Sequence, residues 1–220
     1  MGHRMWLPQI EALEDRFHVI APDLSGFAKS ASSGPFTLAG AAADVTELIR
    51  EHHGSSTHIC GLSLGAMVAL EIAVNHPASV NKLVVSGAQV RPHRALVVGQ
   101  TLVMGLVPSG RLISSMATSI PGGRSELTSA AREDLSQTGK RGLVVAMKQC
   151  GRADFRSTMS KIQSPTLVLC GSRDRINIGA SRLLATAVPN ATLKIIPNVG
   201  HVWNLESPDL FNRTLDEFLT

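Results

Sequence analysis

The stretch Ile59-Cys60-Gly61-Leu62-Ser63-Leu64-Gly65-Ala66 indicates how this chain folds. The apolar residues that lead into it, 57–60, predict a short buried strand, and those that follow it have the spacing of a helix. A strand that turns sharply into a helix strains the residue at the turn and lifts its side chain above the sheet edge. We therefore expect Ser63 at the top of such a turn, with glycines at 61 and 65 because the backbone approaches too closely there for a side chain.

Strands and helices alternate on both sides of this turn. The pattern predicts further strands over 18–24, 80–87, 166–170 and 191–196, and helices over 5–17, 39–52, 178–187 and 208–219. The strand segments are continuously apolar, which is typical of a parallel sheet with helices on both faces. The sequence therefore predicts an α/β fold.

The segment from residue 89 to 162 has no strand pattern. It is rich in Met and Leu, and Pro108, the stretch 121–123 and Gly139 interrupt its helical spacing. We predict a helical cap over 89–162, inserted after the strand at 83–87, so that residues 1–88 and 163–220 form the core. Met104 and Met147 in this cap are candidates for lining an apolar substrate pocket, although methionines at such spacing also fill ordinary cores.

Composition argues against several classes of function. The chain has 220 residues, a formal net charge of +4 and only 4% aromatic residues, and its basic residues are scattered, so we expect no nucleic-acid partner. Its three cysteines, Cys60, Cys150 and Cys170, lie far apart without metal-ligand spacing, so we expect reduced thiols and no metal. No segment is long and apolar enough to span a bilayer, and the N-terminus lacks a signal-peptide pattern, so we expect a cytoplasmic location without a membrane partner.

Three chemically complementary residues follow three different strands. Ser63 follows the strand before the turn, Asp174 follows the strand at 166–170, and His201 follows the strand at 191–196. Functional groups of open α/β sheets gather at the carboxyl ends of the strands, so we expect these side chains at one edge.

The chemistry of a serine nucleophile requires such a trio. A neutral hydroxyl is a weak nucleophile and needs a base within hydrogen-bond reach. An imidazole can take that proton and return it to the leaving group, and a carboxylate on its other nitrogen fixes the tautomer. Two alternatives stay open from the residues alone: Asp174 could be an ordinary turn residue, and Asp23, which also follows a predicted strand, could be the acid.

At this point the sequence resembles the α/β-hydrolase superfamily over nearly its whole length. The matching motifs are His18-Val-Ile-Ala-Pro-Asp-Leu-Ser-Gly-Phe27, Gly61-Leu-Ser-Leu-Gly65, Leu167-Val-Leu-Cys-Gly-Ser-Arg-Asp174, Asn198-Val-Gly-His201 and Asn204-Leu-Glu-Ser-Pro208. The last of these looks like small esterases, enol-lactonases and C–C bond hydrolases. The resemblance implies that Ser63 is the nucleophile, His201 the base and Asp174 the acid, and that the N–H of Leu64 is one oxyanion donor.

The chain departs from the family pattern at its N-terminus. Members of the family begin with two or three more strands, of which the third carries a His-Gly motif whose loop supplies a second oxyanion donor. Here the opening residues, 1–6, resemble only the end of that loop. We expect either that the strands flanking the missing one pair directly, or that the chain is a fragment or has a mis-set start, and we favour the second reading.

The leading hypothesis is a serine hydrolase that cleaves a small carboxylic ester or lactone through an acyl-enzyme intermediate. Val202, Trp203 and the cap helices would shape an apolar pocket. No cofactor or metal is implied, and a homo-oligomer is left open. The alternatives are a C–C bond hydrolase or acyltransferase with the same trio, and a catalytically silent binding protein of the same fold that lacks the second oxyanion donor.

Overall fold

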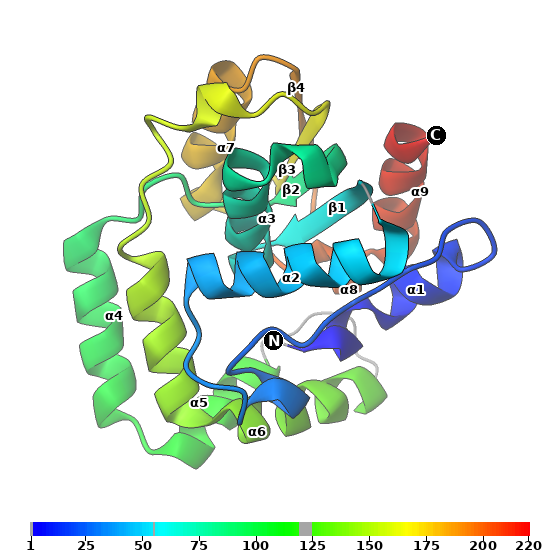
Figure 1. Cartoon of the computed structure of the whole chain (residues 1–220). Coiled ribbons are helices and arrows are strands. Elements are labelled where there is room, and N and C mark those ends of the chain that lie inside the picture. The colour runs from blue at the N-terminus through cyan, green and yellow to red at the C-terminus, as the bar shows by residue number, and fades with distance from the viewer. Residues whose placement is uncertain (1, 55, 119–124) are drawn as a thin grey trace. The chain divides into compact units, whose positions relative to one another are not determined.

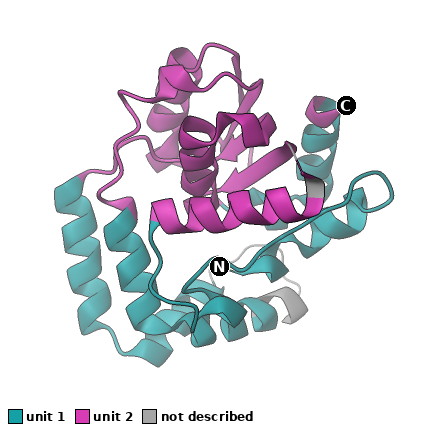
Figure 2. Ribbon diagram, in the orientation of Figure 1, with its two compact units in different colours: residues 1–37, 94–149, 202–217 teal, residues 38–93, 150–201, 218–220 magenta. Residues whose placement is uncertain are grey.

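The computed structural model describes residues 2–54, 56–118 and 125–220 (Figure 1). These residues form two compact units, which Figure 2 distinguishes by colour. Unit 1 consists of residues 1–37, 94–149 and 202–217, and unit 2 of residues 38–93, 150–201 and 218–220. Most of the segment predicted as a cap therefore falls in unit 1, together with the N-terminal segment.

Unit 2 is built on a parallel sheet. Its strands are β1 (Thr57–Leu62), β2 (Val80–Ser86), β3 (Thr166–Gly171) and β4 (Ala191–Ile196), and they are hydrogen-bonded in that order (Figure 1). All three neighbouring pairs are parallel. The predicted α/β class is confirmed. Because all four strands are parallel, their carboxyl ends lie at the same edge of the sheet.

Helices of unit 2 cover this sheet. Helix α3 (Leu64–Asn75) packs on β1 and β2, helix α7 (Arg175–Ala187) packs on β3 and β4, and helix α2 (Leu38–His53) packs on α3. Two 3-10 turns, Pro77–Ser79 and Met159–Lys161, complete the connections. Helix α3 is apolar and buried over most of its surface because it lies between the sheet and α2.

Unit 1 is helical. Its helices are α1 (Leu7–Leu13), α4 (Arg94–Leu106), α5 (Ser109–Thr118), α6 (Ser125–Cys150), α8 (Trp203–Glu206) and α9 (Pro208–Leu219), with 3-10 turns at His3–Trp6, before α1, and at Ala28–Ser30, after it. Pro108 separates α4 from α5, and Gly139, with φ of 64°, kinks α6, as predicted. The predicted break at 121–123 lies outside the described residues. Trp203 anchors the core of this unit, since it is fully buried and its ring lies edge-on to Phe211 at 4.5 Å.

The strand predicted over 18–24 is wrong. These residues are extended, but the described part of the chain has no ladder there. An apolar run forms a strand only beside a neighbouring strand that bonds its backbone, and no described strand pairs with this segment. The first helix was also overextended, because α1 ends at Leu13, not at residue 17.

The apolar helices of the described residues can be compared with a membrane span in length and composition. Within the described ranges, no single helix is long and apolar enough to cross a bilayer, although α4 and α5 together have that length and composition and meet at a bend of 119°.

Candidate active site

Ser63 sits on a strained turn between β1 and α3. Its backbone has φ of 56° and ψ of −115°, a conformation that costs a non-glycine residue roughly 1–3 kcal/mol. The fold maintains this strain through neighbouring contacts: the Ser63 amide donates to the Ser86 carbonyl at 2.8 Å, and the Ser63 carbonyl accepts from the Met67 amide at 3.1 Å. A serine held in this way has little freedom to move its hydroxyl away from the sheet edge.

Of the two glycines predicted to lack room for a side chain at this turn, only Gly61 does so. A Cβ at Gly61 would lie 2.3 Å from the carbonyl oxygen of Gly65, so no larger residue fits there. A Cβ at Gly65 would meet nothing within 4 Å, so the expectation of crowding around position 65 was wrong. The reason is directional: the turn presses the backbone of Gly65 against Gly61, while the Cβ direction of Gly65 points away from that contact.

Asp174 and His201 form a close pair at the ends of β3 and β4. Their Oδ2 and Nδ1 atoms are 2.6 Å apart, and the Asp174 residue is buried. Burial alone would raise the pKa of Asp174, but hydrogen bonds from His201 and Asn177 outweigh it and lower this pKa below its ordinary value. Asp174 is therefore an ionised carboxylate at neutral pH and can orient the imidazole and stabilise its protonated form.

Asp23, the alternative acid, has a different partner. Its Oδ1 accepts from the His3 amide at 2.7 Å and lies 2.9 Å from the His3 ring. Burial would raise the pKa of Asp23, but the bonds from His3 outweigh it and lower this pKa. Of the two candidate acids, it is Asp174 whose carboxylate hydrogen-bonds the ring of His201.

Gly87 connects the serine turn with the Asp–His pair. It follows Ser86, the residue whose carbonyl accepts from Ser63, and its own φ is +60°. A Cβ at Gly87 would lie 2.8 Å from Cε1 of His201 and 3.3 Å from Oδ2 of Asp174. Ser86, which hydrogen-bonds the Ser63 amide, is thus followed directly by Gly87, which lies against the imidazole of His201.

The N-terminus of α3 supplies hydrogen-bond donors beside the serine. Leu64 is the first residue of this helix, and the first amides of a helix have no acceptor within it. They also carry the positive end of the helix dipole, which favours a nearby anion. The Leu64 amide is therefore placed to receive negative charge that develops next to Ser63.

The four predicted pocket residues all belong to unit 1. Val202 packs against a cluster of Met5, Ala131 and Leu205, and Trp203 is fully buried against Phe211. Met104 on α4 and Met147 on α6 are both partly exposed. Their assignment to a substrate pocket stays a prediction.

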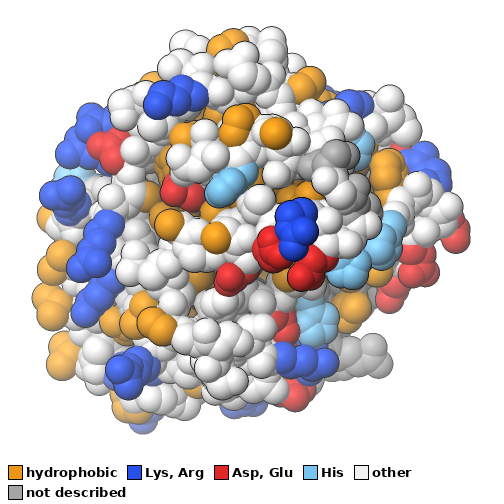
Figure 3. Space-filling view, in the orientation of Figure 1, with side chains coloured by type: hydrophobic (Ala, Val, Ile, Leu, Met, Phe, Trp, Pro, Cys, Tyr) orange, Lys and Arg blue, Asp and Glu red, His pale blue; other side chains and the backbone are white. Residues whose placement is uncertain are grey.

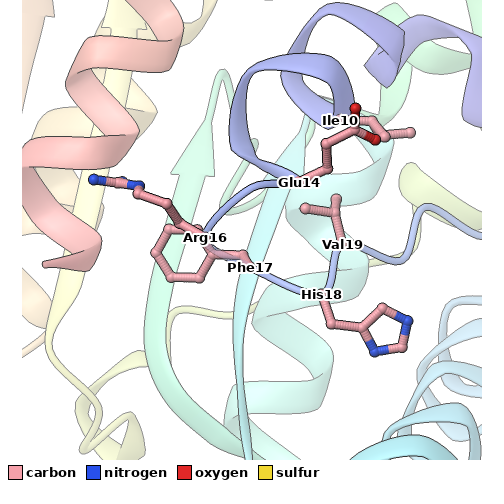
Figure 4. A pocket seen from close by; sticks show the side chains of 6 residues that line it. All are labelled: Ile10, Glu14, Arg16, Phe17, His18 and Val19. Carbon is pink, nitrogen blue, oxygen red and sulfur yellow. The ribbon is translucent and has the colours of Figure 1, made fainter.

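One cavity lies in unit 1, at the end of α1 and the segment that follows it. It has a volume of about 490 Å³ and is lined by Ile10, Glu14, Arg16, Phe17, His18 and Val19. In Figure 4 the guanidinium of Arg16 and the ring of His18 point in opposite directions from this segment. No lining residue is one of the predicted catalytic or pocket residues, and no mechanism requires this cavity.

Two polar residues that the sequence analysis did not identify form a hydrogen-bond network with Asp174. Asn177 donates to both carboxylate oxygens of Asp174, and Gln89 donates to Asn177. A possible signal was the position of Asn177, three residues after Asp174 at the start of a helix, where a side chain can reach back to the preceding turn.

Metal-ligating side chains and basic side chains are the groups that would mark a second site. In the parts of the chain that the structure describes, no group of three or more His, Cys, Asp or Glu side chains is placed to hold a metal ion. On the face shown in Figure 3, Lys and Arg side chains lie in several separate groups among apolar and uncharged ones.

The fold and the placement of these groups define a class of protein, namely α/β proteins with a parallel sheet that carry reactive side chains at the carboxyl ends of their strands. More specifically, the chain belongs to the alpha/beta hydrolase family, whose model matches residues 1–214.

Known relatives within this family are hydrolases. RutD of Serratia proteamaculans, which is named as a carbamate hydrolase, is 30% identical over 96% of this chain and 84% of its own. The 3-oxoadipate enol-lactonase 2 of Acinetobacter baylyi is 25% identical over 96% of this chain and 82% of its own. The fold matches that of the enol-lactonase of Burkholderia xenovorans with a TM-score of 0.85 and 23% identity, covering 99% of this chain and 86% of that chain.

Proposed function

We propose that this protein hydrolyses a small carboxylic ester or lactone through an acyl-enzyme intermediate on Ser63. The observation that carries the proposal is the 2.6 Å bond between His201 and Asp174 beside the backbone that fixes the strained Ser63. The enol-lactonase relative supports the choice of substrate class, because a lactone is a cyclic ester and both open by the same acyl transfer.

The proposed reaction begins with proton transfer from the Ser63 hydroxyl to Nε2 of His201. The hydroxyl oxygen attacks the substrate carbonyl, and the Leu64 amide stabilises the resulting oxyanion. Asp174 accepts the Nδ1 proton of His201 in a hydrogen bond throughout, so the imidazolium that forms is paired with a carboxylate.

The second half of the reaction repeats these roles with water. His201 gives its proton to the leaving alkoxide, which departs and leaves an acyl ester on Ser63. A water molecule then loses a proton to His201 and attacks the carbonyl of this ester. The bond between the acyl carbon and the Ser63 oxygen breaks, His201 returns its proton to that oxygen, and the carboxylic acid product leaves. A lactone differs only in that its leaving group stays attached to the acyl product.

Labelling with a fluorophosphonate tests the proposal directly. Intact mass should show one adduct on the parent protein and none on Ser63→Ala. His201→Ala should be labelled far more slowly, because its serine has no base. Ser172→Ala keeps the trio and serves as the control for loss of a serine near the site.

Turnover of the substrate class needs its own measurement. The labelled protein should hydrolyse short p-nitrophenyl esters or a simple lactone, and Ser63→Ala should not. An unlabelled, folded parent would refute the proposal and leave the catalytically silent alternative. A cytoplasmic location and the absence of a membrane partner remain proposals alongside it.

A further inference from the structure

Asn177 is a buried residue that hydrogen-bonds the carboxylate of Asp174. It occupies the third position of α7, whose N-cap is Asp174. Its Nδ2 donates to Oδ1 of Asp174 at 2.9 Å and to Oδ2 at 2.8 Å. The Asp174 carboxylate is therefore bonded by a side-chain amide of α7.

Gln89 fixes which way the Asn177 amide faces. Its Nε2 donates to Oδ1 of Asn177, and it reaches that position from the loop that follows Gly87. If the amide were reversed, its oxygen would face the carboxylate and its nitrogen would face another NH₂ group, so both contacts would be repulsive. Gln89 therefore turns the NH₂ group of Asn177, and not its carbonyl oxygen, toward Asp174.

The donor and acceptor roles around Asp174 then determine the state of the imidazole. Nδ2 of Asn177 donates to both carboxylate oxygens, which favours the ionised carboxylate, and an ionised carboxylate can only accept from Nδ1 of His201. At 2.6 Å from Oδ2, Nδ1 must therefore carry the proton and donate it to Asp174. The lone pair of the neutral ring is left on Nε2, the nitrogen that a serine base requires.

We propose that Asn177, oriented by Gln89, is a positioning residue. By donating to both carboxylate oxygens of Asp174, it fixes the acceptor that selects the productive tautomer of His201. Its catalytic consequence rests on the proposed function, but its effect on the Asp–His pair does not. Neither residue touches the substrate in this scheme, and both act through Asp174.

The test compares Asn177→Leu and Gln89→Leu with Ser181→Ala. Leucine is close in size to both replaced residues but lacks hydrogen-bonding groups, and Ser181 is a buried polar residue of the same helix outside the network. The readouts are the downfield proton NMR signal of the His201 Nδ1–H, the fluorophosphonate labelling rate of Ser63, kcat and KM with an ester, and thermal unfolding.

In Asn177→Leu the downfield signal should be lost or shifted upfield, and the labelling rate and kcat should fall about 10- to 100-fold, the loss expected for a hydrogen bond to a charged group, with little change in KM. Gln89→Leu should move the same signals less, and Ser181→Ala should leave them unchanged. If Asn177→Leu does not fold, Gln89→Leu decides, because Gln89 has no bond to Asp174 or His201.

A folded Asn177→Leu and Gln89→Leu with an unchanged signal would overturn the inference. If the parent protein resists labelling but these variants lose the signal, the inference holds and the proposed function fails. If the parent is labelled and the variants keep both the signal and the labelling rate, the proposed function holds and the inference fails.

Discussion

Replacement of Gly87 by alanine should disable the site while leaving the fold intact. The new Cβ would lie 2.8 Å from Cε1 and 2.9 Å from Nδ1 of His201, where ordinary contact begins at 3.4 Å. The ring must therefore move by about half an ångström, or the backbone at position 87 must move instead. Either shift displaces Nε2 relative to Ser63 and strains the bond to Asp174.

The expected magnitude follows from two separate effects. A displacement approaching 1 Å in a catalytic group costs on the order of 10²-fold in rate, so we expect labelling of Ser63 to slow by 10- to 100-fold. The φ of +60° at position 87 adds about 1–2 kcal/mol of strain for alanine, which lowers the melting temperature of a chain of this size by roughly 2–8 °C.

The assay measures labelling rate and thermal unfolding on Gly87→Ala and on Gly179→Ala. Gly179 lies on α7 in the same unit, and a Cβ there would meet nothing within 4 Å. Gly179→Ala should gain up to about 1 kcal/mol from helix propensity and keep its labelling rate. A folded Gly87→Ala that is labelled as fast as the parent would refute the reasoning that the imidazole rests on Gly87.

Three further predictions concern stability and reactivity. Trp203→Ala should destabilise the protein by about 3–5 kcal/mol in chemical unfolding, since it removes a fully buried ring; a loss below 1 kcal/mol would contradict its role in the core of unit 1. Folding lowers the pKa of Asp174, so its ionised form stabilises the fold at pH values above its unfolded pKa of about 3.9, and this contribution disappears as the pH falls through its folded pKa. The melting temperature should therefore drop less on acidification in Asp174→Asn than in the parent. Parallel curves of melting temperature against pH for the two proteins would contradict this. Burial raises the pKa of Cys60 to about 12, so iodoacetamide at pH 8 should leave Cys60 unmodified in the native protein and alkylate it after denaturation, as peptide mass spectrometry can show.

Local patterns were sufficient to predict the sheet and the order of its elements. Apolar runs bounded by Gly and Pro predicted the strands, and the bounds of β4 and α9 agree with the prediction to the residue. The candidate residues could also be chosen from the sequence, because parallel strands bring the residues that follow them to one edge whatever the details of packing. The Asp–His bond then depends only on which strands are neighbours.

The contacts that surround the pair could not be predicted in the same way. Asn177 is a polar residue in the first turn of a helix, and its meaning depends on the rotamer that brings its amide to Asp174. Gln89 is 88 residues away from it along the chain. Likewise, the extended segment at 18–24 has the composition of a strand. It differs from a strand only because no neighbouring strand in the described fold is hydrogen-bonded to it.

The position of the candidate site is set mainly by backbone register. Hydrogen bonds continue the sheet beyond the ends of its strands: Ser63 N to Ser86 O at 2.8 Å, Gly87 N to Leu169 O at 3.0 Å, and Ser172 N to Ile196 O at 2.8 Å. Each functional loop is thus tied to the next strand before its side chain is reached. A slip of one residue between strands would turn these side chains to the other face of the sheet, so the spacing from each strand end to Ser63, Asp174 and His201 is more tightly constrained than the identity of the residues between.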